Sequence, residues 1–494
     1  MSAVYPEITP ARRSPIVWLA PVQALCAFTV LAAITGGQML RSWILGALLF
    51  AMALPLAISL EAGLLAMIIF EPFRGLTRRA EYLIVDYSQF DPIHVLTPLV
   101  ALMAMGMMLH RYRLNIVRAT PLATPVSILA AIFFVQIFNP LQGGLLTGLS
   151  GAMLILVPMC WFYFGQAVSS RFMRITFQVI VALGLLTSLY GVYQLIYGYP
   201  QFEQYWLENV EFYVSIGVGH VKRPLATFTN AEEWGRYIVM GALMAFGFGA
   251  AAVSLRKRGL WFACGLTLST VLVFTGQRTA IFGLMLGIGC LVLFGARNLR
   301  GAAIRLTLLL LPVVFVVVLA KPPAEDDMWS REETDKVGTL LSHTQRGTLQ
   351  PTGEESLYVR FEVWKDLLIN VIPYRPLGSG TGAGSLSALK FANAADDIAI
   401  DNFVLVLAVA GGIPAALLFL WILGRAALFA FRRTRETATD PDTIAISRIT
   451  AALIPVFILN NIFGLSFSLY AVAPIGWLII GWISVQEGRA REEV

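Results

Sequence analysis

Three arginines in this chain of 494 residues stand beside distinctive backbone signals. Arg223 precedes a proline ahead of an apolar block, Arg278 lies in the short turn Thr-Gly-Gln-Arg-Thr, and Arg360 begins a stretch that ends in a glycine-rich run. Guanidinium groups match phosphate oxygens with paired, charge-assisted hydrogen bonds. If the three lie together, they would bind a diphosphate and stabilise it as a leaving group.

Each arginine also has a simpler interpretation. Arg278, between two apolar blocks, is typical of a side chain that extends from a helix end to the membrane interface. Arg223 and Arg360 are compatible with solvated loop charges or with ion pairs to a nearby glutamate. The occurrence of all three in one chain favours the phosphate site.

Three carboxylates are candidates for a base that activates an acceptor hydroxyl. Asp401 stands at the start of an apolar block, where partial shielding from water would raise its pKa toward neutrality. It is equally suited to capping the helix that follows. Glu232 and Glu233 enter a predicted helix N-terminus, where negative charge is favourable, so a structural role is the alternative for both.

The candidate residues form two sets. The predicted catalytic set is Arg223, Arg278, Arg360 and Asp401, and the predicted substrate-binding set is Lys222, Asn230, Glu232, Glu233, Trp364, Gly380, Gly382 and Asn402. The sequence shows no acidic metal cluster, no histidines with ligand spacing and no GxxxxGK(S/T) phosphate loop. We therefore expect neither a metal nor a cofactor.

Composition predicts the elements that must position these residues. The chain is 57% hydrophobic and 13% charged, whereas soluble domains carry about 25% charged residues. Its apolar blocks of about 18–25 residues have the length that spans a membrane as a helix. We expect an all-α fold, a polytopic transmembrane bundle of about 12–14 spans with a large periplasmic loop that contains amphipathic helices. The predicted spans are residues 16–35, 43–56, 58–72, 93–110, 123–140, 145–166, 174–196, 235–254, 259–275, 280–296, 303–320, 400–423, 446–463 and 466–485.

Basic residues set the predicted orientation. Lys and Arg gather in alternate loops, which by the positive-inside rule places both termini in the cytoplasm. The net charge of +6 has this explanation, so nucleic acid is not an expected partner. Arg74, Arg78 and Arg79 are an exception, because this topology places them outside. They follow the block 43–72, which we divide at Pro55 because proline would kink a longer helix.

This topology divides the chain into five regions. They are an N-terminal transmembrane bundle (1–199), a first periplasmic loop (200–234), central transmembrane helices (235–320), a large periplasmic loop (321–399) and C-terminal transmembrane helices (400–494). In the large loop, Ser356–Val371 is predicted to be an amphipathic helix with Phe361, Trp364 and Leu368 on its apolar face. The glycine-rich run 378–384 that follows is predicted to be a flexible, tight-turning segment.

Four stretches together resemble the O-antigen ligase and polymerase superfamily. They are RPLATFTN before a span, TGQRTA between spans, R…W…P…PLGSGTG in the large loop, and DNFVLVLAVAGGIPAALLF. The resemblance covers about residues 200–425. It implies a multi-pass protein of the bacterial inner membrane that transfers glycans from undecaprenyl-diphosphate-linked donors at the periplasmic face. By the same resemblance, Arg223, Arg278 and Arg360 would hold the donor diphosphate.

One departure from the family pattern bears on the reaction. Ligases of the family carry His-Asn where this chain has Asp401-Asn402, and the family histidine activates or positions the acceptor hydroxyl. The departure favours the polymerase branch, which would join lipid-linked repeats into a surface polysaccharide or exopolysaccharide. The alternatives are an O-antigen ligase or O-oligosaccharyltransferase that moves the glycan to lipid A core or protein, and, in another class, a lipid-linked oligosaccharide flippase.

The expected partners follow from this resemblance. An undecaprenyl-diphosphate-linked oligosaccharide would be the donor and, for a polymerase, also the acceptor. Membrane lipids surround the bundle, and a flippase and chain-length or export proteins are further expected partners. The flippase alternative is less favoured, because transporters bury charges at mid-membrane and keep short loops.

Overall fold

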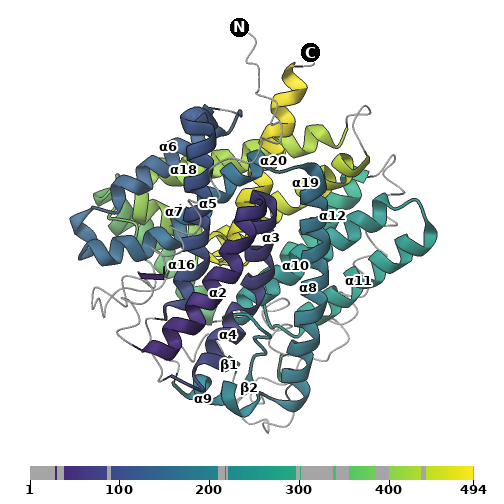
Figure 1. Cartoon of the computed structure of the whole chain (residues 1–494), viewed down its shortest axis with the longest axis horizontal. Coiled ribbons are helices and arrows are strands. Elements are labelled where there is room, and N and C mark those ends of the chain that lie inside the picture. The colour runs from purple at the N-terminus through teal and green to yellow at the C-terminus, as the bar shows by residue number, and fades with distance from the viewer. Residues whose placement is uncertain are drawn as a thin grey trace.

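The computed structural model describes residues 28–29, 38–85, 91–118, 120–209, 217–218, 221–295, 301, 336, 338–340, 355–384, 400–435 and 441–492. The predicted span 303–320 lies outside these ranges, as do most of the predicted span 16–35 and of the large loop 321–399. In the described part, the chain is helical apart from one short hairpin, which confirms the predicted all-α class (Figure 1).

The helices that make up the bundle are α2 (Met39–Ile58), α3 (Leu60–Phe70), α4 (Arg74–Glu81), α5 (Ile93–Tyr112), α6 (Ala123–Gln136), α7 (Leu145–Ala167), α8 (Ser170–Tyr197), α9 (Gln201–Asn209), α10 (Ala231–Ala251), α11 (Leu255–Val273), α12 (Arg278–Gly295), α16 (Glu355–Asp366), α18 (Phe403–Arg433), α19 (Pro441–Ile462) and α20 (Ala473–Glu492). Short 3-10 helices cover Glu71–Phe73, Arg113–Arg118, Pro140–Gln142, Ile372–Tyr374 and Ser466–Ser468, and a π-helical turn covers Leu367–Val371. The hairpin pairs β1 (Gly217–Val218) with β2 (Val221–Lys222) in antiparallel register, with Gly217 opposite Lys222.

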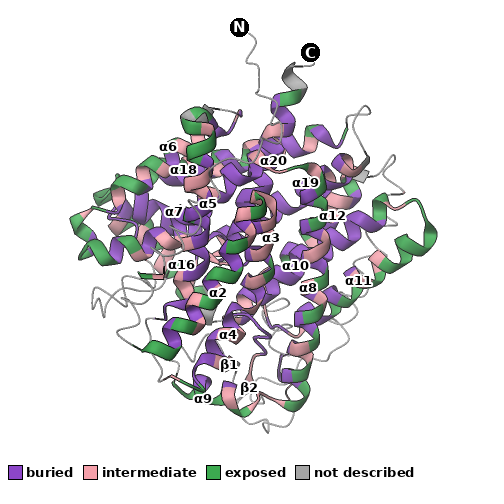
Figure 2. Cartoon of the chain, viewed as in Figure 1, coloured by how far each residue is buried: buried purple, intermediate pink, exposed green. Residues whose placement is uncertain are grey.

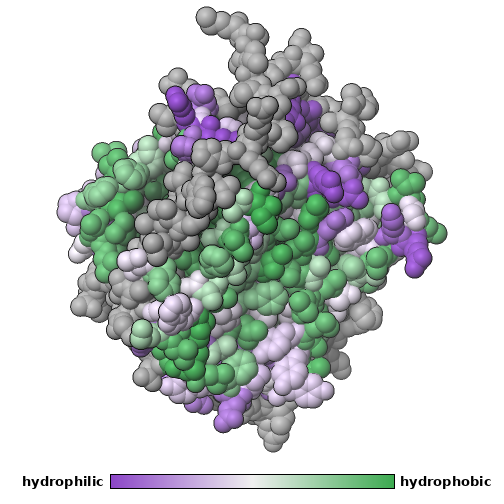
Figure 3. All heavy atoms as spheres, in the orientation of Figure 1, coloured by the Kyte–Doolittle hydropathy of each residue, from purple (hydrophilic) through white to green (hydrophobic). Residues whose placement is uncertain are grey.

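Membrane residence follows from the length and apolarity of the helices. Within the described ranges, six helices are long and apolar enough to cross a membrane, namely α2, α5, α7, α8, α18 and α19, and α6 and α12 are shorter apolar helices. Hydrophobic side chains cover much of the described surface in the view of Figure 3, as lipid-facing helices require. The chain is therefore a polytopic membrane protein.

The predicted division of the block 43–72 is present, two residues beyond the boundary between the predicted spans 43–56 and 58–72. Pro55 lies inside α2, and the chain breaks four residues later at Ser59, which has extended backbone angles (φ −162°, ψ 157°). The Ser59 hydroxyl accepts a hydrogen bond from the Ala62 backbone N–H at 3.1 Å. Ser59 thus caps α3, and this cap rather than the proline sets the boundary.

Helix α10 lies at the centre of the bundle. Figure 2 shows it buried along almost its whole length, and it packs against α8, α11, α12 and α19. Gly191 of α8 allows the Trp234 ring to lie against it, since a Cβ at Gly191 would stand 2.3 Å from that ring. The first turn of this buried helix therefore has fixed surroundings.

Helix α18 is broken where the large loop meets it. Gly412 has φ 84° and ψ 173°, and Pro414 follows. The carbonyls of Val409 and Ala410, which lose their helical partners there, accept hydrogen bonds from Ser379 N (2.8 Å) and Gly380 N (3.1 Å). The Ile413 N–H in turn donates to the Pro376 carbonyl at 3.0 Å. Loop segment 376–380 thus completes the hydrogen bonding of a membrane helix.

Candidate functional site

Arg223 and the turn that contains Arg278 are brought together. Gly276, in that turn, has φ +66°, and a Cβ placed on it would stand 3.6 Å from Arg223 Nε and 3.8 Å from Arg223 Cδ. The Arg223 side chain therefore lies against the turn, two residues from Arg278. These arginines come from sequence regions about 55 residues apart, so the fold supports their predicted proximity.

The turn itself is fixed by the hydroxyl of Thr275. That hydroxyl donates to the Leu272 carbonyl at 2.7 Å and accepts from the Gln277 N–H at 3.2 Å. Gly235 of α10 permits close packing, because a Cβ there would lie 3.3 Å from both Thr275 Oγ1 and Gln277 Cβ. The Arg278 turn thus contacts one side of the beginning of α10.

Arg360 and Asp401 form an ion pair with each other. Their Nη2 and Oδ2 atoms are 3.0 Å apart, and the two side chains are 36% and 46% exposed. Asp401 does not cap α18, because Asn402 does so by accepting the Leu405 N–H at 3.0 Å. The sequence identified both members of the pair but did not predict that they bind each other.

A second ion pair lies within α10 and is electrostatically coupled to Asp401. Glu232 and Arg236 pair with each other, and buried Arg236 also donates to the Asn460 carbonyl at 2.9 Å and to the Ser466 hydroxyl. Arg236 interacts electrostatically with both Asp401 and Arg360. Four charged groups on α10, on α16 and before α18 therefore form one cluster.

The environment of Asp401 raises its pKa. Partial burial is the largest cause; the Arg360 charge acts in the opposite direction, and the nearby Glu232 carboxylate raises the pKa further. A carboxylate with a raised pKa is a better proton acceptor near neutrality than an ordinary aspartate. The geometry is therefore compatible with the predicted base, while Arg360 holds the carboxylate in place.

Glu233 points away from this cluster. Its carboxylate is buried, accepts the Ala471 N–H at 2.9 Å and lies 3.5 Å from Arg74 Nη2. Arg74 in turn stacks over the Tyr470 ring at 3.4 Å. Asn230 caps α10 by accepting the Glu233 N–H at 2.8 Å. The structure thus gives these two predicted substrate-binding residues contacts within the fold.

The remaining predicted ligands lie in three places. Lys222 belongs to β2, and the Trp364 ring contacts Phe463, with ring centres 5.8 Å apart. Gly380 and Gly382 are buried, and the Gly382 N–H donates to Gln142 Oε1 at 3.0 Å. The glycine-rich run is therefore held against the bundle, contrary to the predicted flexibility.

The predicted apolar face of the loop helix is divided between two environments. Trp364 packs inward, whereas Phe361 and Leu368 are each 55% exposed. The π-helical turn that begins at Leu367 changes the spacing of side chains from that residue on, so the position of Leu368 departs from the regular helical period.

Arg74, Arg78 and Arg79, the exception to the charge rule, are neutralised in the fold. Arg78 lies 3.0 Å from Asp91, Arg79 lies 2.6 Å from Glu203, and Arg74 lies between Glu71 and Glu233. Arg79 also donates to the Phe228 carbonyl at 2.6 Å, so it lies at the same end as the first loop. The charges of these arginines are therefore balanced by carboxylates within the fold.

Sequence reasoning missed Arg236, Arg79, Gln194 and Glu203 as parts of this region. A signal existed for Arg236, because it stands one helical turn after Glu232 within an apolar span. Among the described residues, no three His, Cys, Asp or Glu side chains gather as a metal site would need.

The fold and the site together define a polytopic membrane protein with an arginine-rich site where loops meet the bundle. Residues 263–420 match the family described as O-antigen ligase. This match over part of the chain is consistent with the O-antigen ligase and polymerase superfamily that the sequence motifs resemble. Comparison of the whole chain with curated proteins gives no match. The matched region contains Arg278, Arg360 and Asp401, whereas Arg223 and α10 precede it.

Proposed function

We propose that the chain polymerises undecaprenyl-diphosphate-linked oligosaccharide repeats at the periplasmic face of the bacterial inner membrane. The domain match supports a lipid-linked glycan ligase or polymerase role. The observation that carries the proposed glycosyl transfer is the approach of both candidate regions to the beginning of α10. The Arg223–Arg278 region contacts Gly235, and the Arg360–Asp401 pair interacts with Arg236, the next residue.

The reaction assigns a role to each pair. An acceptor sugar hydroxyl attacks the anomeric carbon of the donor and forms the new glycosidic bond. The bond from that carbon to the diphosphate breaks, and undecaprenyl diphosphate leaves with the electron pair. Arg223 and Arg278 bind the diphosphate as its charge develops, and Asp401 accepts the hydroxyl proton.

The Arg360–Asp401 ion pair suggests how donor binding prepares the base. Both side chains are partly exposed, so a phosphate oxygen can reach the Arg360 guanidinium. A diphosphate that binds Arg360 would compete with Asp401 and release its carboxylate toward the acceptor. The base would then be available mainly when a donor is bound.

The O-antigen ligase description of the matched family favours a second candidate, in which the acceptor is lipid A core or protein. The chemistry at the donor is the same for both, so the acceptor alone separates them. Asp401, in place of the family histidine, is the reason that we rank the polymerase first.

A strain that lacks the chain tests the function. Loss of a polymerase leaves single repeats, some attached and some lipid-linked, whereas loss of a ligase leaves unattached long chains. Repeats trapped on the inner side of the membrane would instead indicate a flippase and would refute both transferase proposals. A gel of surface glycan together with analysis of lipid-linked intermediates distinguishes these outcomes.

Complementation of that strain tests the site. We expect Arg278→Ala to abolish product at normal expression, because the leaving group loses a fixed cation. The matched control is Arg258→Ala, near the N-terminus of α11, where the Arg258 side chain donates to the Ala252 carbonyl in an exposed position. Normal polymer from Arg278→Ala would remove the role that we give this residue.

A further inference from the structure

A buried group of three side chains lies beside the first loop. Arg79 of α4 and Glu203 of α9 pair at 2.6 Å, with side-chain exposures of 1% and 0%. Gln194 of α8 donates to the other Glu203 oxygen at 2.9 Å. We call Arg79, Gln194 and Glu203 the loop frame. A fully buried ion pair costs desolvation energy, so its presence calls for an explanation.

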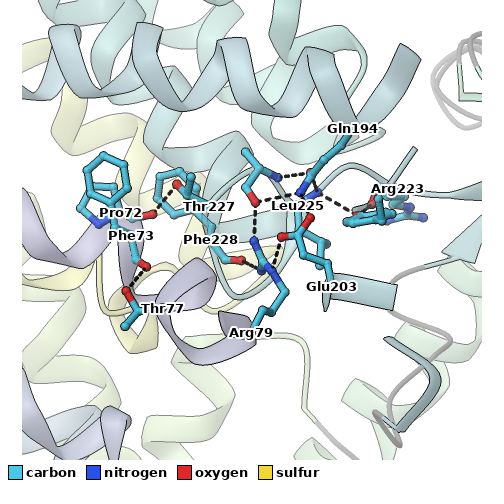
Figure 4. Close-up of polar contacts among 12 residues, drawn as sticks. Pro72, Phe73, Thr77, Arg79, Gln194, Glu203, Arg223, Leu225, Thr227 and Phe228 are labelled. Carbon is cyan, nitrogen blue, oxygen red and sulfur yellow. Dashed lines mark hydrogen bonds and ion pairs between the residues drawn. The ribbon is translucent and has the colours of Figure 1, made fainter. Parts of the chain in front are cut away.

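The loop frame binds the backbone that follows Arg223. Arg79 donates to the carbonyls of Phe228 (2.6 Å) and Ala226 (Figure 4). The Gln194 side-chain oxygen accepts the N–H groups of Leu225 at 3.1 Å and Ala226 at 2.8 Å, and its amide donates to the Ala226 carbonyl at 3.2 Å.

Ala226 shows why this segment needs support. Its φ is +48°, a left-handed conformation that is unfavourable for a residue with a Cβ. Such a backbone persists where its surroundings over-determine it. Both its N–H and its carbonyl are bound by the loop frame, so the frame selects this turn.

Further contacts extend the support to Arg223. The Tyr199 hydroxyl donates to the Arg223 carbonyl and accepts the Leu225 N–H at 3.1 Å. On the other side, the Thr227 hydroxyl donates to the Pro72 carbonyl at 2.5 Å, and the Leu76 N–H donates to the Thr227 carbonyl at 2.7 Å. The backbone from Arg223 to Phe228 is thus fixed from α4, α8 and the α8–α9 connection.

We infer that Arg79, Gln194 and Glu203 are positioning residues that hold Arg223 against the Arg278 turn, ready to bind a diphosphate. The loop frame lies outside the matched region 263–420, so the N-terminal helices would supply part of the site. The inference rests on the proposed function, since it takes Arg223 as a phosphate ligand. Its physical basis is preorganisation, because a guanidinium already in place loses less entropy on binding.

Gln194→Met tests the loop frame, because methionine has a similar size but makes no hydrogen bond to the turn. The substitution leaves the Arg79–Glu203 ion pair in place, so no buried charge loses its partner. Hydrogen exchange of the purified full chain in detergent should speed up in residues 221–228 and stay unchanged in α12 and α19. Gln166→Met is the control, since the buried Gln166 amide has no hydrogen-bond partner among the described residues. Unchanged exchange in 221–228 would overturn the inference.

Binding of undecaprenyl diphosphate to the same proteins gives the second readout. We expect Gln194→Met to weaken binding of undecaprenyl diphosphate about tenfold. In an Arg223→Ala background the same substitution should change binding less than about twofold, because Gln194 acts through the position of the Arg223 guanidinium, which is then absent. An equal loss in both backgrounds would indicate a purely structural role and refute the inference. If Gln194→Met does not fold, Tyr199→Phe takes its place, because it removes just the hydroxyl that contacts Arg223 and Leu225.

Failure of the proposed function would give results that differ from failure of the loop-frame inference. Wild-type protein would then bind undecaprenyl diphosphate no better than undecaprenyl monophosphate, and Arg223→Ala would have no effect. That outcome would remove the diphosphate role, and with it the inferred purpose of the loop frame, even if residues 221–228 exchange faster in Gln194→Met.

Discussion

Arg223 and Arg360 are both candidate phosphate ligands, yet the protein supports them in opposite ways. The backbone after Arg223 is bound by Arg79 of α4 and Gln194 of α8, and the ion pair between Arg79 and Glu203 is almost fully buried. Arg360 projects from α16 into a partly exposed ion pair with Asp401. The first arginine is therefore fixed by the fold, whereas the second can exchange its partner.

This difference suggests a division of labour at the site. A fixed cation defines where the diphosphate lies, and an exchangeable cation responds to its arrival by releasing a base. The two kinds of support should therefore differ in their contribution to stability and in their effect on pH dependence.

The largest expected effect comes from the buried pair. Arg79→Met leaves the Glu203 carboxylate buried without its cation, and we expect a loss of about 3–5 kcal/mol in the free energy of unfolding. Arg360→Gln breaks a partly exposed pair and should cost less than about 1 kcal/mol. Denaturant unfolding in detergent measures both. Similar costs for the two variants would contradict the comparison, and adding Glu203→Leu to Arg79→Met should recover part of the loss.

An intermediate effect is expected where the large loop is attached to the bundle. A Cβ on Gly382 would lie 2.4 Å from the Thr147 carbonyl oxygen. Gly382→Ala should therefore cost about 1–3 kcal/mol through overpacking, measured by the same unfolding experiment. Gly289→Ala in α12 is the control, because the space around a Cβ at Gly289 is open, and it should be neutral or slightly stabilising. If Gly382→Ala is also neutral, the loop is not held at this point.

The smallest expected effect is a shift in pH dependence. Glu232→Gln removes a negative charge that raises the Asp401 pKa and leaves Arg236 without its partner, so the Asp401 pKa should fall. Because the base must be ionised, the acidic limb of the rate profile should move to lower pH. Initial rates of polymer formation measure the shift. Glu362→Gln, whose carboxylate pairs with Lys365, should leave the limb in place, and a limb that moves upward in Glu232→Gln would refute the assignment.

The local hydropathy pattern was sufficient to predict the long apolar helices. The predicted spans 93–110 and 145–166 agree closely with α5 (Ile93–Tyr112) and α7 (Leu145–Ala167), because hydropathy over one span determines membrane insertion. Helix α8 begins four residues before its predicted start at 174, since Ser169 caps it by accepting the Phe172 N–H at 3.1 Å.

Contacts between residues far apart in the chain could not be predicted from the hydropathy pattern. Arg79 and Glu203 are 124 residues apart, and no periodicity connects them. Helix α9 and the small hairpin lie in a polar stretch whose structure depends on such contacts. The charged candidates themselves were identifiable from residue type and motif order, but the ion pair between Arg360 and Asp401 required coordinates.

The interruption of α18 at Gly412 has a consequence for how the chain is assembled in a membrane. As an isolated segment, this helix would present the Val409 and Ala410 carbonyls to lipid without donors, which hydrocarbon does not tolerate. The donors come from residues 379–380, which are synthesised before α18. Biogenesis should therefore require that this earlier stretch be retained beside α18 during insertion, and a chain cut between the two would insert its C-terminal part poorly.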